Sequence, residues 1–476
     1  MKNPKIISLV VLSGMLITMI LMATCSSEQD ISNEYVLQIN NVGLRKGVFE
    51  RRFKLTQNYG SHQEFTPEIL KTYIQDVLEP DYLFIRDAYA KKIDQEADIQ
   101  KQIMDSRISL LADNHPILFK KLMISKDELK DFYGKKAIAY DLEIVQTQTY
   151  SDADSIYKAL LKGHKLEVDK KSENSELVFP RVINIPDVTY GEQLHPEVFP
   201  ELIKMDEGEI SRPIYTSPIW TIVKLNKKRS HKMPKFEDIE KQMVMKSQTL
   251  FKYEEQKKLI DSLRTKYSVS VNGELFKMLI AAYHKKNVYG WLDEHKLGNT
   301  NLNATIVQIG EHEISVKYFI HVFNQANRYV QFSNLMVEDL NHFINGYIDY
   351  YLLYLDADEK GVDQDKFVKD KLENKIHRIL LTKYLKEEIA GKITFTEEDV
   401  LQHYNNNPQK WNGPFKSVES SVKNDLRMQR MLVFKDKVLE ELRNKYHNIQ
   451  YNETLLAEIA GELTLEKNAA NVIGQQ

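Results

Sequence analysis

Two stretches of strand-forming residues begin two similar halves of the chain. Residues 35–39 (YVLQI) and 305–309 (TIVQI) align at an offset of 270, and each predicts a short strand followed by a turn and an amphipathic helix. The same offset pairs further apolar positions: Leu44 with Ile314, Phe49 with Phe319, and Phe53 with Phe323. This pattern indicates an internal repeat.

The repeat continues through the next helices. Residues 82–95 match residues 351–364 at an offset of 269. Each copy then starts another helix with a serine or threonine followed three residues later by an acid, which is the pattern of a capping box. The pairs are Ser125 with Glu128 and Thr396 with Asp399, and the two helices run to Tyr133 and Tyr404.

The copies differ by one insertion. The helices that begin at Phe236 and Phe415 match at an offset of 179, and each is followed by a short strand-forming segment. Between Tyr133 and Phe236 the first copy has about 92 residues more than the second has between Tyr404 and Phe415, which is the size of a small domain. Because each copy begins and ends with a strand, we expect the two ends of one copy to pack together and to display the insert outward.

We therefore predict a mostly helical protein with two helical lobes, the first of which carries an inserted α+β domain. The predicted parts are a signal segment at 1–24, a tether at 25–34, the N-terminal part of the first lobe at 35–134, the insert at 135–230, a long helix and strand closing the first lobe at 231–280, a connector at 281–304, the second lobe at 305–460, and a polar tail at 461–476.

Composition narrows the function classes. The low content of glycine (18) and proline (13) in 476 residues, with 28% charged residues, favours a helix-rich soluble protein over collagen-like or low-complexity chains. The net charge of −3 without a concentrated basic face predicts no nucleic-acid partner. No metal-ligand cluster, Ser-His-Asp arrangement or phosphate-binding glycine loop stands out, so we expect no cofactor, no metal and no use of ATP.

The first residues predict export. Lys2 and Lys5 precede an uncharged run at 6–23, which is the order of a secretory signal. Cys25 is the single cysteine of the chain and follows Thr24 directly, in a segment that resembles the bacterial lipobox. That resemblance implies lipidation of Cys25 and a lipid-anchored protein of the cell envelope that faces the periplasm. The alternative is an uncleaved N-terminal anchor, which also places the rest of the chain outside the cytoplasmic membrane.

The insert resembles a known domain family. Strand composition at 137–147, helical spacing at 152–162 and a returning strand at 220–225 predict an α+β unit. Between them, residues 208–216 (GEISRPIYT) resemble the second half of a parvulin-type peptidyl-prolyl isomerase domain. A parvulin insert between an N-terminal helical region and a long helix is the plan of the SurA and PrsA envelope foldases, and the helical lobes resemble those of SurA and trigger factor.

The catalytic positions of that family are changed in this chain. Active parvulins carry one histidine in the first strand and one in the last. Here the first position is Asp141 or Leu142, depending on register, and the last is Thr221. His164 and His195 lie in neither strand, and we expect both on the surface. The family's GGDLG stretch is also absent near residues 183–191. We therefore expect the insert to have lost isomerase activity and to have no confident catalytic residue, although Asp141 remains a candidate polar group of the pocket.

The resemblance implies an ATP-independent chaperone that holds unfolded exported proteins, with outer-membrane β-barrel precursors among its clients. Two alternatives stay open, namely a working prolyl isomerase with a rearranged pocket and a structural lipoprotein of an envelope complex. A stripe of four tyrosines at helical spacing belongs either to the core or to a groove for clients. These are Tyr347, Tyr350, Tyr351 and Tyr354.

Overall fold

The computed structural model describes residues 34–61, 64–120, 122–164, 179–286, 289–327 and 334–473. The fold is mostly helical with an inserted α+β domain, as the sequence predicts. Cys25 and the predicted signal segment lie outside the described residues. Within the described ranges, no helix combines the length and the apolar character needed to cross a membrane.

The chain forms two compact units, and each unit combines parts of both repeat copies. Unit 1 comprises residues 34–106 and 369–473 as far as they are described, and unit 2 comprises residues 107–368. The boundaries fall within two helices, α6 (Ala97–Asp113) and α15 (Lys366–Tyr384). Each copy therefore begins in one unit and ends in the other.

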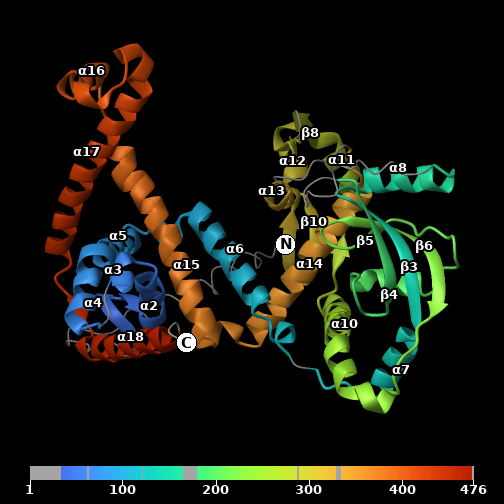
Figure 1. The fold of residues 1–476 in the computed structure, drawn as a ribbon. Coiled ribbons are helices and arrows are strands. Elements are labelled where there is room, and N and C mark those ends of the chain that lie inside the picture. The colour runs from blue at the N-terminus through green and yellow to red at the C-terminus, as the bar shows by residue number, and fades with distance from the viewer. Residues whose placement is uncertain are drawn as a thin grey trace, which may run out of the picture. The chain divides into compact units, whose positions relative to one another are not determined.

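Unit 1 contains a three-stranded sheet in the order β12-β1-β2, surrounded by helices. Figure 1 shows α18 beside α4, against the opening strands of the chain. Apart from α6 and α15, its elements are β1 (Tyr35–Ile39), β2 (Val42–Arg45), α2 (Lys46–Lys54), α3 (Gln57–Ser61), α4 (Pro67–Tyr73), α5 (Glu79–Ala90), α16 (Glu397–Asn406), α17 (Phe415–Lys445), β12 (Ile449–Tyr451) and α18 (Glu453–Ile473).

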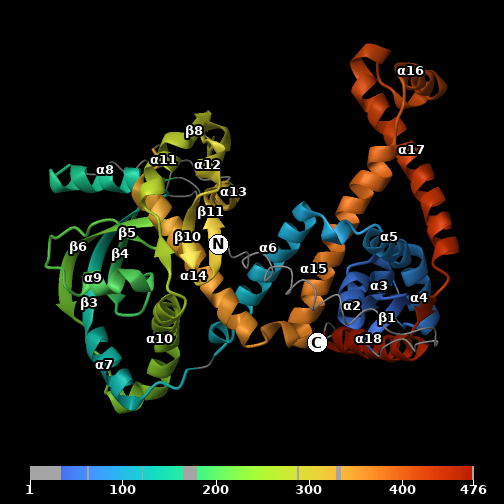
Figure 2. The same cartoon turned by 180° about the vertical axis from the view of Figure 1, so that it is seen from behind.

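Unit 2 contains the insert and a second frame of strands and helices (Figure 2). The insert and the flanking helices are α7 (Lys126–Lys136), β3 (Ile138–Thr147), α8 (Tyr150–Leu161), β4 (Arg181–Thr189), α9 (Phe199–Leu202), β5 (Ile214–Tyr215), β6 (Trp220–Ser230) and α10 (Phe236–Lys266). The frame continues with β7 (Ser270–Val271), α11 (Glu274–Ala282), β8 (Tyr283–Lys286), β9 (Tyr289–Leu292), α12 (Asn299–Leu302), β10 (Thr305–Ile309), β11 (His312–Ser315), α13 (Val316–Ala326) and α14 (Val337–Glu359).

The expectation that each copy closes on itself is wrong. The closing strand β12 of the second copy pairs with β1 of the first, so that Gln38 lies opposite Gln450. The closing strand β7 of the first copy pairs with β10 of the second, so that Gln308 lies opposite Ser270. Both copies present the same strand pattern, and therefore pairing within a copy and pairing between copies bury equivalent side chains. The long helices α6 and α15 cross the boundaries between the units, so each copy continues from one unit into the other.

Polar contacts between residues of the two copies are present in both units. In unit 1, Asp87 of the first copy accepts hydrogen bonds from Tyr384 (2.9 Å) and Lys445 (2.7 Å) of the second. In unit 2, Asp356 of the second copy accepts one from His115 of the first (2.7 Å). Residues 115 and 384 are equivalent at the offset of 269, as are 87 and 356.

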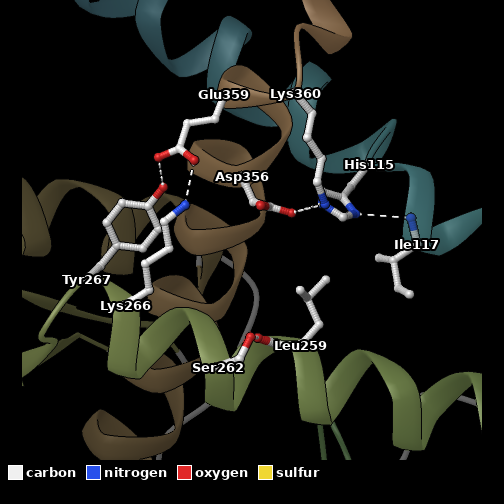
Figure 3. A network of polar contacts seen from close by, with 9 residues as sticks. All are labelled: His115, Ile117, Leu259, Ser262, Lys266, Tyr267, Asp356, Glu359 and Lys360. Atoms are coloured by element: carbon white, nitrogen blue, oxygen red, sulfur yellow. Dashed lines mark hydrogen bonds and ion pairs between the residues drawn. The ribbon is translucent and has the colours of Figure 1, made fainter.

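Figure 3 shows the network of unit 2 from close by. His115 Nδ1 accepts the backbone N–H of Ile117 (3.1 Å), so that Nε2 donates to Asp356. Burial acts to raise the pKa of Asp356, but hydrogen bonds from Lys360 (2.5 Å) and His115 outweigh it and lower that pKa. Asp356 is therefore an ionised anchor between segments far apart in the sequence. In the same view, Glu359 accepts hydrogen bonds from the Lys266–Tyr267 pair that ends α10.

The insert is an antiparallel sheet in the order β4-β3-β6-β5 with α8 on one face and α9 on the other. On the α9 side, the apolar side chains of β3 and β6 belong to the same core cluster as those of α7 and α10. Phe132 of α7 packs on Tyr190 at a ring distance of 5.8 Å, and Glu192 bridges Lys136 of α7 and Lys246 of α10. The insert is thus packed against the frame on this face, contrary to the expectation of an outward display.

Candidate functional site

The two first-strand positions of the predicted catalytic pocket lie on β3 and have structural contacts. Leu142 is buried in the core cluster of the insert, where it lies opposite Leu225 of β6. Asp141 accepts hydrogen bonds from Arg229 (2.7 Å) and from the backbone N–H of Asp187 (3.0 Å). Leu142 has no polar group, and the carboxylate of Asp141 is already hydrogen-bonded, so neither side chain offers a free polar group to a substrate.

The last-strand position, Thr221, is buried on β6 and shares a hydrogen bond with Thr216, with 2.7 Å between the two hydroxyl oxygens. It lies opposite Gln146 of β3, whereas Asp141 lies opposite Lys227. Five residues of β-strand span about 17 Å, and therefore Asp141 and Thr221 cannot share one substrate pocket. The structure does not bring the predicted catalytic positions together.

The two histidines of the insert lie outside its strands. His164 is exposed, and His195 accepts the backbone N–H of Glu197 at the start of a short helical turn (3.3 Å). The basic residues 227–229, which follow the predicted returning strand at 220–225, are part of β6. The strand is longer than its apolar pattern because Arg229 pairs with Asp141 and Asp187 across the sheet.

A cleft of about 460 Å³ opens at the β5–β6 end of the insert, against α13 and α14. Its volume lies within the range of typical ligand pockets. Aromatic side chains dominate its lining. The described residues that line it are Gln148, Tyr215, Ser217, Pro218, Trp220, Val322, Phe323, Ala326, Asn327, Asp339, His342, Phe343, Gly346, Tyr347 and Tyr350. We call this site the aromatic cleft.

Three rings form one wall of the aromatic cleft. The ring of His342 stacks on Tyr215 at 4.5 Å and meets Trp220 edge-on, also at 4.5 Å. Burial lowers the pKa of His342, so the imidazole is neutral at pH 7. The wall therefore joins the insert to α14 through aromatic contacts without a positive charge.

The tyrosine stripe of α14 divides between core and cleft. Tyr351 and Tyr354 are buried, whereas Tyr347 and Tyr350 line the aromatic cleft. The hydroxyl of Tyr350 donates to Asp113 at 2.9 Å, which fixes the position of its ring. Two of the four side chains thus belong to the core, and the other two line a cleft.

Asp339, at the start of α14, is the acid of the aromatic cleft and is only 7% exposed. Its carboxylate accepts the backbone N–H groups of Tyr150 (2.9 Å) and Met336 (3.1 Å) and the indole N–H of Trp220. Burial, the largest influence, raises its pKa to about 6 although these hydrogen bonds act to lower it. Sequence reasoning missed this residue because its partners come from segments up to 189 residues away.

Residues 124–241 match the family model described as the PPIC-type PPIASE domain, which confirms the parvulin-type insert. Solved structures with similarity to the chain include the peptidylprolyl isomerase PrsA from Bacillus anthracis, with 16% identity over 42% of this chain and 94% of that chain and a TM-score of 0.20.

Two further similar structures are a foldase protein PrsA and a SurA-like chaperone. The PrsA of Streptococcus pneumoniae has 13% identity over 46% of this chain and 86% of that chain, with a TM-score of 0.21. The SurA-like chaperone from Campylobacter jejuni has 14% identity over 53% of this chain and 100% of that chain, with a TM-score of 0.19. No curated protein matches the chain.

Proposed function

We propose that this protein is an ATP-independent chaperone that holds unfolded exported proteins and that its parvulin-type domain is inactive as an isomerase. One observation supports both parts. In the domain that matches the PPIC-type family, the predicted catalytic positions are Leu142, which is buried in the core, and Thr221, which is hydrogen-bonded to Thr216. The same unit carries the aromatic cleft.

Loss of catalysis follows from the chemistry of the reaction. Rotation about a peptide bond has a barrier of about 18–20 kcal/mol, and an isomerase lowers it with polar groups held around the twisting bond. Leu142 offers no such group, and the hydroxyl of Thr221 is engaged by Thr216. Asp141 is paired with Arg229 on the other face of the strand. The alternative of a rearranged pocket around Asp141 therefore has no support in these contacts.

Retention of binding follows from the character of the aromatic cleft. Tyrosine and tryptophan side chains supply large contact areas at low conformational-entropy cost, which suits weak binding of many sequences. The chain is rich in aromatic residues, with 25 tyrosines and 19 phenylalanines, and its 14 methionines add adaptable apolar contacts. We propose outer-membrane β-barrel precursors among the clients.

The site of action belongs to the same proposal. Lipidation of Cys25 anchors the protein to a membrane of the cell envelope, with both units facing the periplasm. The similar structures are named as a foldase protein PrsA and as SurA-like chaperones, of which one is called periplasmic, and these names agree with the proposed role in folding.

Two assays on the full chain in lipid nanodiscs test the proposal. The first measures aggregation of a diluted, unfolded outer-membrane protein, and we expect suppression at near-stoichiometric ratios without ATP. The second measures proline-limited refolding of a reporter, a step of about 10–100 s, and we expect no acceleration. Thr221→His should not create activity because the first-strand partner is also absent.

Three results would contradict the proposal. Acceleration of proline-limited refolding that is lost in Asp141→Ala would favour the working isomerase. Failure to suppress aggregation at a tenfold excess would remove the holding function. Co-purification with a single stoichiometric envelope protein, without binding of unfolded chains, would favour a structural lipoprotein.

A further inference from the structure

Within the described part of the chain, the carboxylate of Asp339 has no counter-ion. Buried charges are normally paired, because desolvation of an isolated charge is costly. Among the residues that the structure describes, Asp339 forms hydrogen bonds with N–H donors but no ion pair. The charged group that acts on it most strongly is another acid, Glu338.

The part of the aromatic cleft that the structure describes has one carboxylate and no cationic side chain in its lining. None of its described lining residues is a lysine or an arginine, and burial keeps His342 neutral. Two cations act on the neighbouring Tyr150: Lys158 is paired with Asp154 at 2.6 Å, and Arg212 is exposed and is not a lining residue of the cleft. The site thus combines one acid with several aromatic rings, whose faces attract cations.

The aromatic cleft also has room for a side chain from another molecule. Gly346 lines it on α14, is exposed, and has no atom within 4 Å of the position that a Cβ would occupy. A glycine inside a helix lowers stability by about 1 kcal/mol relative to alanine. No neighbouring atom requires the absence of a side chain at position 346.

We propose that the aromatic cleft binds the cationic side chain of an arginine or lysine in an extended client segment, with Asp339 as its counter-ion. This inference rests on the proposed chaperone function. The charge of the site complements a cation, and its rings complement the aliphatic stem of either side chain. Arginine fits better than lysine because the planar guanidinium stacks on aromatic rings while donating hydrogen bonds to a carboxylate.

Peptide binding tests the inference without any change to the protein. Short, unstructured, fluorescent peptides differ only at one central residue, which is arginine, lysine, leucine or citrulline. Citrulline keeps the shape of arginine without its charge. Binding to the full chain in nanodiscs is followed by fluorescence anisotropy. We expect the arginine peptide to bind about tenfold more tightly than the citrulline peptide, with lysine in between.

Two variants locate the effect. Asp339→Asn should abolish the preference for arginine over citrulline, whereas Glu338→Gln should retain it. Gly346→Leu should fill the aromatic cleft and weaken the arginine peptide about tenfold. Gly461→Leu is its matched control, because Gly461 lies in helix α18 of unit 1 and also has open space around its Cβ position. Circular dichroism confirms that each variant is folded.

The outcomes separate this inference from the proposed function. Equal binding of the arginine and citrulline peptides by the unaltered protein overturns the inference, whether or not aggregation is suppressed. A preference that survives in Asp339→Asn overturns it as well. If arginine is preferred but aggregation is not suppressed, the chaperone proposal fails and the cation site stands.

Discussion

Replacement of Asp339 by asparagine should remove a pH dependence from the stability of unit 2. The pKa of Asp339 is raised by burial from its ordinary 3.8 to about 6, so the folded state binds the proton more tightly than the unfolded state does. Stability therefore falls as the pH rises from about 4 to 6 and stays lower above that range. Asparagine does not titrate and removes this effect, but its NH2 group cannot accept one of the N–H groups that the two carboxylate oxygens accept from Tyr150 and Met336, which lowers stability by about 1–3 kcal/mol at every pH.

The size of the effect follows from the two pKa values. The interval from 3.8 to about 6 corresponds to up to about 3 kcal/mol at 1.36 kcal/mol per pH unit. The difference in unfolding free energy, Asp339→Asn minus the unaltered protein, should be more positive at pH 7.5 than at pH 4 by up to this value, and the lost hydrogen bond adds the same offset at both pH values.

Neighbouring titrations cancel in this comparison. The groups that face Asp339 are Tyr150 of α8, Tyr215 of β5, Tyr283 of β8, and Glu338 and His342 of α14. His342 has a lowered pKa and so contributes stability that increases as the pH rises toward 6.5, which is opposite in sign. All of these groups are present in both proteins, and only Asp339 differs.

The assay is urea unfolding at pH 4 to 8 followed by tryptophan fluorescence. Both proteins carry Trp411→Phe, so that emission comes from Trp220 and Trp291 of unit 2. Glu338→Gln removes the same charge from the neighbouring position and is the matched control. A difference for Asp339→Asn that is independent of pH, or that becomes less positive between pH 4 and pH 7.5, would show that burial does not raise the pKa of Asp339.

Three further predictions concern the anchor, the insert and the exchange of copies. Cys25→Ala should leave the protein as unprocessed precursor or release it from the membrane fraction, and unchanged lipid labelling would contradict this. Excision of the insert, bridged by a linker with the sequence of residues 405–414, should cause aggregation. Phe132 and Leu250 then become exposed to water, which costs about 1.5–3 kcal/mol of folding free energy for each side chain. A retained cooperative thermal transition would show instead that the frame folds alone. In a Cys25→Ala background, cysteines at Gln38 and Gln450 should form a disulfide on oxidation, whereas cysteines at Gln38 and Ser270 should not; the reverse result would restore closure within each copy.

The repeat itself could be predicted closely from the sequence. The helices α10 and α17 begin at the predicted Phe236 and Phe415, and each has 31 residues. Both predicted capping boxes are present, at Ser125 and at Thr396. These features depend on side chains close together in the chain, and a single sequence contains that information.

The partners of the closing strands could not be predicted. Because the strand patterns of the two copies are equivalent, the sequence does not distinguish β12 on β1 from β12 on β10. The aromatic cleft could not be predicted from the sequence either, because Tyr215, His342 and Asp339 come together only when the insert packs on α14. The tyrosine stripe was the one local sign of this site, and periodicity alone does not separate its two buried tyrosines from the two half-buried tyrosines that line the cleft.

According to our proposal, this protein holds many unfolded chains and no single fixed partner. The most direct measurement places a photo-crosslinking amino acid at Tyr347 of the aromatic cleft in the native envelope and identifies the captured proteins by mass spectrometry. An exposed residue outside the cleft, Glu274, carries the same group in a control. We predict capture of many exported proteins at Tyr347, through segments next to arginine or lysine, and little at Glu274. Capture of one stoichiometric partner, or the same proteins at both positions, would contradict the account.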